Sequence, residues 1–203
     1  MQLGVRCLAG GVSIEEKTDK MPKLRLIRGG YPREMSLGSV DIVAAPEHKP
    51  PFTVDAVAFE EDTFLVLSAD RRVRAPKEPL VRLMTRVIET RPETPGSVLV
   101  KGKRPLRLLA IVHDLNQEPS WREEWVASAL EGIFREAESR RLRSIALPFL
   151  GTLHGSLKKE RFVELLRCAL ERMSPNHLKR LWLLVPAGTS SKILEMLESE
   201  SQK

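Results

Sequence analysis

The sequence predicts an α/β fold in which a mixed, mostly parallel sheet is covered by helices on both faces. From residue 95 onward, short apolar segments alternate with segments whose apolar residues recur at helical spacing. The apolar segments are continuous rather than alternating, which is typical of strands buried on both faces. The length of 203 residues suits one sizeable α/β domain with a small extension.

The first 95 residues predict short strands and one helix. Strands are predicted over residues 23–27, 39–45, 54–59 and 63–68. The acidic residues 60–62 are interpreted as a solvated turn between the last two strands. Pro79 near a helix start and an apolar face predict a helix over residues 78–91. We expect residues 1–40 to form a β-rich extension and residues 41–203 to form the α/β domain.

The rest of the chain predicts the core of that domain. Strands are predicted over residues 95–102, 105–115, 145–150 and 178–187. Helices are predicted from Ser120 to the basic residues 140–143, over 157–173 and over 190–201. Ser120 and Glu123 have the spacing of a capping box. Ligands of such sheets bind at the carboxyl ends of the strands.

Composition predicts a globular cytoplasmic protein. Hydrophobic residues make up 42% of the chain and charged residues 30%, and no apolar run approaches the roughly 20 residues of a membrane helix. The N-terminus has no sustained apolar segment of a secretory signal. Cys7 and Cys168 form neither a disulfide framework nor a zinc pattern, and Cys168 is expected in the core. We expect no membrane partner, no metal and no cofactor.

The charge makes an anionic partner plausible, because the formal net charge is +6. Basic residues are concentrated in residues 71–74, 101–107 and 140–143. The alternative is that these are solvated loops and helix ends, where cations are also common. The chain has no basic–aromatic alternation of the kind that stacks single-stranded bases, which disfavours an RNA partner.

The stretch SIALPFLGTLHGSLKKERF, residues 144–162, carries the strongest functional signal. An apolar strand ends in a turn bracketed by Gly151 and Gly155, and a helix follows at once. Backbone N–H groups at a helix N-terminus attract anions, so the turn is a candidate phosphate site. Tight strand-to-helix turns also need glycine for conformational reasons alone. Its position at the carboxyl end of a strand favours the phosphate site.

Several segments in order resemble blocks of the macrodomain family, whose members are ADP-ribose-binding modules. The segments are VDAVAF, PGSVLVKG, LLAIVHDL, SALEGIFREAESRRLRSIALPFLGTLHG and LKRLWLLVP. The resemblance covers roughly residues 40–190. It implies a three-layer α/β/α sandwich with a cleft for ADP-ribose or a related nucleotide. It also implies a ligand phosphate on the turn formed by Gly151, Thr152, Leu153, His154, Gly155 and Ser156.

The resemblance implies further ligand contacts. Phe149 leads into the turn and is expected near the sugar, and Asp55 belongs to the VDA segment at the start of a strand. Glu47 stands at about the distance before Asp55 at which the family carries an adenine-contacting aspartate. Arg72, in the basic segment 71–74, is a candidate for contacting phosphate by its side chain.

The chain departs from the family pattern at several places. The glycine turn is a residue short, and Leu153 or His154 stands where a glycine is usual. Residues 59–62, FEED, stand where the family carries ribose-binding and catalytic asparagines. Residues 68–79 contain no glycine, where a glycine-rich phosphate loop is usual. These departures imply binding without efficient hydrolysis. If the chain hydrolyses ADP-ribosyl linkages, Asp62 and His154 are its candidate catalytic residues.

Three functions remain open from the sequence. The first is binding of ADP-ribose or a related nucleotide, and the second is hydrolysis of ADP-ribosyl or ADP-ribose phosphate linkages. The third is a degenerate macrodomain retained as a scaffold or as a protein or RNA interaction module. His113 and His154 also suit purely structural hydrogen bonding, and Glu60, Glu61 and Asp62 also suit a general base or a hard metal ion.

Overall fold

The computed structural model describes residues 34–67, 91–189, 193, 195 and 197. The chain divides into two units, Met1–Tyr31 and Pro32–Lys203, and all described residues lie in the second. Its first strand begins at Glu34. Residues 34–37, which the sequence assigned to the extension, therefore take part in the sheet of the second unit.

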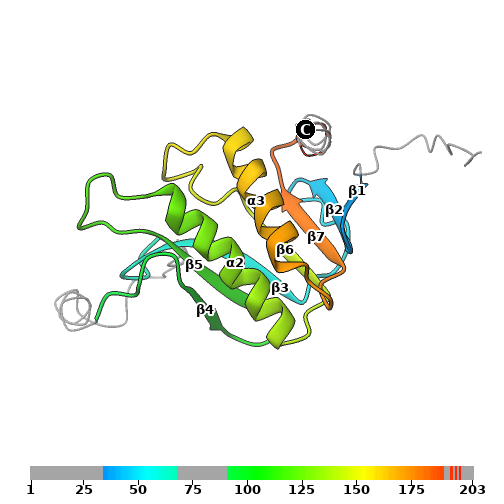
Figure 1. Ribbon diagram of the computed structural model, residues 1–203, viewed down its shortest axis with the longest axis horizontal. Coiled ribbons are helices and arrows are strands. Elements are labelled where there is room, and N and C mark those ends of the chain that lie inside the picture. Colours follow the sequence, from blue (N-terminus) through cyan, green and yellow to red (C-terminus); the bar gives the residue numbers. More distant parts are fainter. Residues whose placement is uncertain (1–33, 68–90, 190–192, 194, 196, 198–203) are drawn as a thin grey trace, which may run out of the picture. The chain divides into compact units, whose positions relative to one another are not determined.

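The described strands form one mixed sheet in the order β1-β2-β7-β6-β3-β5-β4 (Figure 1). Strands β2, β7, β6, β3 and β5 run parallel, and β1 and β4 pair antiparallel at the two edges. This arrangement confirms the predicted α/β class with a mostly parallel sheet. The strand bounds are β1 Glu34–Leu37, β2 Val40–Ala45, β3 Ala56–Asp62, β4 Val98–Lys101, β5 Leu106–His113, β6 Ser144–Leu147 and β7 Arg180–Leu184.

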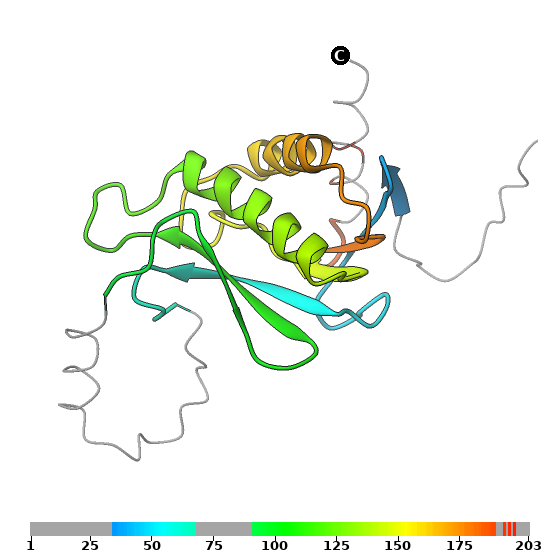
Figure 2. The same ribbon diagram turned by 60° about the horizontal axis from the view of Figure 1, so that its bottom comes forward.

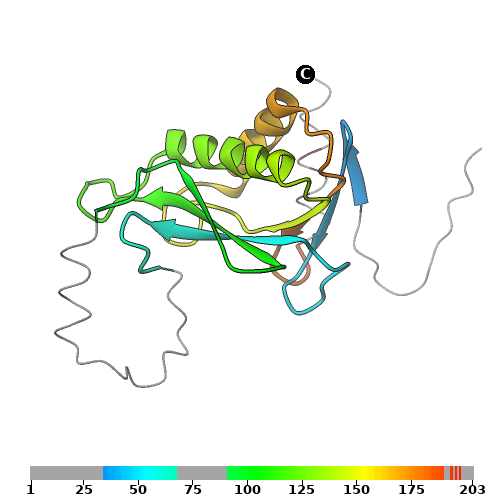
Figure 3. The ribbon, with the colours of Figure 1, turned by 90° about the horizontal axis from the view of Figure 1, so that it is seen from below.

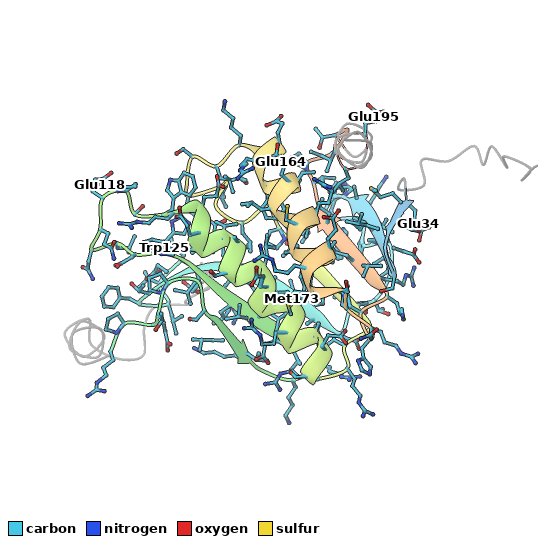
Figure 4. All side chains as sticks on the ribbon, in the orientation of Figure 1. Glu34, Glu118, Trp125, Glu164, Met173 and Glu195 are labelled. Atoms are coloured by element: carbon cyan, nitrogen blue, oxygen red, sulfur yellow. The ribbon has the colours of Figure 1, made fainter. Side chains whose placement is uncertain are left out.

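Two helices, α2 (Glu123–Ser139) and α3 (Lys159–Met173), cover one face of the sheet (Figures 2 and 3). The apolar stripe that predicted α2 is buried against the strands. Trp125 and Glu164 mark the early turns of the two helices, and Met173 marks the end of α3 (Figure 4). Both helices therefore run from the carboxyl edge of the parallel strands back to their amino edge, as right-handed parallel crossovers require.

Charged side chains form hydrogen bonds between α2 and α3, and between α2 and the loop that follows α3. Arg161 of α3 bonds Glu123 of α2 at 2.5 Å, and its hydrogen bond lowers the pKa of Glu123. Near the end of α2, Glu138 accepts hydrogen bonds from the His177 side chain and from the backbone N–H of His177. Partial burial raises the pKa of Glu138, but these bonds and those from residues 176 and 178 lower it to about 2.

The end of β3 differs from what the sequence predicts. The prediction of a solvated turn over residues 60–62 is wrong, because β3 extends through Asp62 and both Glu61 and Asp62 are fully buried. The predicted strand that follows is also wrong, since the chain turns over residues 63–67. The Asp62 carboxylate accepts the N–H groups of Phe64 at 2.7 Å and of Val66 at 2.8 Å. A carboxylate that bonds its own downstream amides favours a turn over a strand.

Two further expectations need correction. Helix α2 begins at Glu123 with Arg122 as its N-cap, and no side chain caps it. Ser120 instead lies before the helix, where its carbonyl accepts the N–H of Asp114. Cys168 is an exposed free thiol rather than a core residue.

Some predicted elements lie outside the described residues: the strand over 23–27, the helix over 78–91 and most of the helix over 190–201. Of that last segment, Ile193 and Leu197 are described, and both are buried in the core. In the part of the chain that the structure describes, no helix is long and apolar enough to cross a membrane.

Candidate ligand-binding site

A cavity of about 820 Å³ opens at the carboxyl ends of the parallel strands. This is the edge of an open α/β sheet at which ligands bind. Most of its lining is apolar, with a few charged and polar side chains, as is usual for small-molecule sites. It is lined by residues 46–48 after β2, 57–60 of β3 with Leu67, 148–149 and 152–154 after β6, Lys159 of α3, and 184–187 at the end of β7.

A second, smaller cavity of about 410 Å³ lies elsewhere, between the β1–β2 turn and the end of α3. Its lining includes Ser39, Leu170 and Pro175. It is remote from the carboxyl ends of the parallel strands and touches none of the residues that the sequence singled out. We therefore build the candidate site on the larger cavity.

The glycine turn after β6 has a shape that depends on both of its glycines. Gly151 has φ +74°, a conformation that side chains other than glycine rarely adopt. A Cβ atom on Gly155 would lie only 2.4 Å from the carbonyl oxygen of Gly151 and 2.9 Å from the Trp121 ring. The turn is closed by a hydrogen bond from the N–H of Leu157 to the carbonyl of Gly151, 3.2 Å. Thr152 adds a hydroxyl bond to the Phe149 carbonyl at 2.9 Å.

Inside this closed turn, a run of backbone N–H groups is left without a hydrogen-bond acceptor. The N–H groups of residues 153–156 donate no hydrogen bond within the described residues. Leu153, His154 and Ser156 are exposed residues, and Gly155 is half-buried. Leu153 and His154 line the cavity, and α3 begins only a few residues later at Lys159. Unpaired amides beside a helix N-terminus are a favourable environment for an anion.

The first amide of the turn is already bonded to a carboxylate of the chain itself. Glu60, at the cavity end of β3, accepts the N–H of Gly151 at 3.0 Å through Oε2. Its Oε1 atom lies 2.5 Å from Nε2 of His113, the last residue of β5. The Glu60 and His113 side chains are only 7% and 1% exposed, so this pair is buried. It ties the ends of β3 and β5 to the start of the glycine turn and fixes where the turn stands.

The structure places Asp55 at the other end of β3, away from the cavity. Its carboxylate accepts the backbone N–H groups of Arg143 at 2.8 Å and Ser144 at 3.2 Å. It also lies 3.4 Å from the guanidinium of Arg104. Asp55 thus joins the amino ends of β3 and β6, and it is not among the residues that line the cavity.

The other predicted site residues divide into three groups. Phe149 and His154 line the cavity, where the Phe149 ring packs on Phe162 and the His154 ring stands edge-on to His113 with centroids 6.1 Å apart. Asp62 is buried outside the lining, with its carboxylate engaged by three backbone amides. Arg72 lies outside the described residues.

The charged groups around the cavity are of both signs. Glu47 and Glu60 are acidic, and His48, His154 and Lys159 offer imidazole or ammonium groups. Such a mixture suits a ligand that carries both phosphate and hydroxyl groups. In the described part of the chain, no three His, Cys, Asp or Glu side chains converge in a way that could hold a metal ion.

Sequence reasoning missed two parts of this site. It did not foresee that Glu60 bonds the glycine turn, and it did not include Lys159 or residues 184–187 in the lining. The position of 184–187 after a parallel strand could have suggested them, because every such strand end reaches the same edge.

Comparison with known proteins bears on the fold. No protein-family model matches the chain, and no curated protein sequence matches it. Among solved structures, the macrodomain of Oceanobacillus iheyensis with MES bound is similar, with a TM-score of 0.62 at 13% sequence identity. The match covers 85% of this chain and 98% of that one. A mutant of the same macrodomain with ADPR matches with the same TM-score, identity and share of this chain.

Two other solved structures extend the comparison. The macrodomain of Thermus aquaticus DarG has a TM-score of 0.51 at 22% identity, over 71% of this chain and 97% of that one. The macro domain of ganglioside induced differentiation associated protein 2 has a TM-score of 0.52 at 10% identity, and the match covers 77% of this chain and 83% of that one. At these identities the likeness concerns the fold alone. The resemblance seen in the sequence is thus confirmed at that level, and the chain has a divergent macrodomain fold.

Proposed function

We propose that the chain binds ADP-ribose or a related nucleotide in the cavity at the carboxyl edge, with a ligand phosphate on the turn of residues 151–156. The observation that carries the proposal is the run of amides at 153–156 that have no acceptor among the described residues. The cavity lies directly beside this turn and is large enough for a nucleotide.

The fold supports the choice of ligand. Solved structures of the Oceanobacillus iheyensis macrodomain are named as complexes with ADPR and with ADP. The cavity of this chain is lined by Lys159 and His154, which can contact phosphate, and by Glu47, which can accept hydrogen bonds from an adenine amino group. The Phe149 ring offers an apolar surface for the sugar.

The proposal is for binding rather than turnover. Asp62 is poorly placed to act as a general base, because its carboxylate oxygens are occupied by three backbone N–H groups and the residue is fully buried outside the cavity lining. Both oxygens of Glu60 are engaged as well, one by His113 and one by Gly151. His154 is exposed at the cavity and is the residue to substitute first if hydrolysis is detected.

Isothermal titration calorimetry with ADP-ribose, ADP and AMP tests the proposal. We expect saturable one-to-one binding of ADP-ribose, with AMP at least about tenfold weaker because it lacks the second phosphate and ribose. Absence of binding for all three nucleotides would contradict the proposal and favour the scaffold alternative. Binding of AMP as tight as that of ADP-ribose would show that the second phosphate and the distal ribose add no affinity.

A further inference from the structure

The amino ends of the strands, opposite the cavity, carry a concentration of cations that the nucleotide site does not use. Residues 101–107, 140–143 and 179–180 contain four, three and two Lys or Arg residues. They form the β4–β5 turn, the loop before β6 and the entry to β7 (Figure 1). All of these cations are exposed. We call this surface the basic edge.

The basic edge is one continuous surface, although its segments are far apart in the sequence. Asp55 accepts the backbone N–H of Arg143 and pairs with Arg104, which joins the first two segments. The N–H groups of Lys179 and Arg180 both donate to the carbonyl of Arg143, at 2.9 and 3.0 Å, which joins the third. Because neighbouring strands are about 4.8 Å apart, β7 to β5 spans about 14 Å of this edge.

Among the described residues, the basic edge carries more cations than carboxylates that pair with them. The side chains of Lys103, Arg141 and Lys179, one from each segment, make no hydrogen bond or ion pair with the described residues. The nearby carboxylates are already engaged: Asp55 bonds Arg104 and two backbone amides, Glu136 pairs with Arg140 of the edge at 2.8 Å, and Glu138 bonds His177. The edge therefore presents a net positive field to solvent.

The basic edge lacks exposed large apolar side chains among the described residues, and this distinguishes between an acidic protein, a membrane surface and a nucleic acid as its partner. Among the described residues, the exposed large hydrophobic side chains are Val66, Leu115 and Leu153, and all three follow the carboxyl ends of strands. The basic edge thus offers no apolar centre for a protein interface and no anchor for a membrane surface. It also offers no exposed aromatic platform for the bases of a single strand.

We propose that the basic edge binds the phosphate backbone of a nucleic-acid duplex. A duplex presents phosphates at about one charge per 1.7 Å of its axis, in a row that a line of Arg and Lys side chains can follow. Guanidinium groups bond phosphate oxygens in pairs, and the edge is rich in arginine. Contacts of this kind position the protein without reading the base sequence. This surface is separate from the nucleotide cavity, and the proposal does not depend on it.

The test is fluorescence anisotropy of the full chain with a labelled DNA duplex of about 20 base pairs, with a duplex RNA as a second probe. The variant is K103Q/R141Q/K179Q, which removes one unpaired cation from each segment. The control is K49Q/R91Q/K158Q, which removes three exposed cations at the other end of the strands. At about 0.1 M salt, loss of three phosphate contacts should weaken DNA binding about 500-fold. The salt slope should fall by about 2.7, and the control should bind as the unmodified chain does.

Three results would overturn the proposal. One is equal affinity of K103Q/R141Q/K179Q and the control for both duplexes. Another is binding of the unmodified chain to phosphatidylserine vesicles or to poly-glutamate as tightly as to duplex, which would make the edge a membrane or acidic-protein surface. The third is a preference for single-stranded probes. Titration of the same variant with ADP-ribose should give unchanged affinity, so failure here is distinguishable from failure of the nucleotide site.

Discussion

Glu60 is the residue that most distinguishes this cavity from a simple anion site. Its carboxylate bonds the first amide of the glycine turn and the imidazole of His113, while the amides of 153–156 have no acceptor among the described residues. A negative charge at the start of the turn repels a phosphate bound further along it. The same charge holds the turn in place. Glu60 is therefore expected to lower the affinity for phosphate while it fixes the position of the turn.

Substitution of Glu60 by Gln tests whether its charge both weakens phosphate binding and stabilises the turn. E60Q keeps the shape of the side chain and removes its charge, so affinity for ADP-ribose should rise about three- to tenfold as the repulsion is relieved. The free energy of unfolding should fall by about 1–3 kcal/mol, because two charge-assisted hydrogen bonds are weakened. Calorimetry and urea denaturation measure the two effects. An affinity that falls together with stability would contradict the predicted repulsion, and would show that the position of the turn, held by Glu60, matters more to binding than its charge.

Gly155 tests whether backbone amides hold the phosphate. In G155A the new Cβ would meet the Gly151 carbonyl at 2.4 Å, so the turn must shift and its amides lose their alignment. We expect ADP-ribose affinity to fall at least about tenfold, with a loss of roughly 1–3 kcal/mol in unfolding free energy.

The matched control for G155A is S156A in the same turn. It removes a hydroxyl that makes no hydrogen bond within the described residues and leaves the backbone unchanged. Binding by S156A should equal that of the unmodified chain. Equal binding by G155A and S156A would exclude the turn amides as the phosphate site.

At the scale of the elements, helix α2 is fixed at its end by Glu138. The carboxylate bonds the loop that leads from α3 to β7, and its pKa is lowered to about 2 although partial burial acts the other way. A carboxyl whose folded pKa lies below its unfolded value of 4.5 stabilises the fold above that value. Its contribution is lost as the pH falls from 4.5 toward 2.

E138Q should therefore lower the unfolding free energy at neutral pH by about 1–2 kcal/mol, a figure that allows for solvent screening at this partly exposed site. The difference between E138Q and the unmodified chain should shrink as the pH is lowered from 4.5 toward 2. Chemical denaturation at several pH values measures it. A difference that is constant down to pH 2 would show that the effect is one of packing rather than of charge.

At the scale of the whole molecule, the elements beyond residue 95 could be predicted because the spacing of apolar residues along each segment indicates its buried side. In α2 the apolar residues recur at helical spacing, and in β5 they are continuous. In each case the pattern within the segment itself predicts which residues are buried. The end of β3 could not be predicted in this way. The Glu60 side chain is buried there because it meets partners 53 and 91 positions away along the chain.

The candidate site follows the same division. Phe149 and residues 152–154 line the cavity and could be proposed from the sequence, because strand, turn and helix are consecutive there. Asp55 was expected at the ligand from family resemblance, but it lies at the amino edge, because a strand carries its first and last residues to opposite edges of the sheet. The sequence shows the basic residues only as separate segments. The order of the strands in the sheet places these segments side by side.

The measurement that tests the central claim most directly is a nuclear magnetic resonance titration of the ¹⁵N-labelled chain with ADP-ribose. The account predicts saturable shifts of the amide resonances of residues 151–156, with those of Arg143 and Lys179 at the basic edge unchanged. Shifts confined to other residues, or none at saturating ligand, would contradict the claim that this turn is the phosphate site.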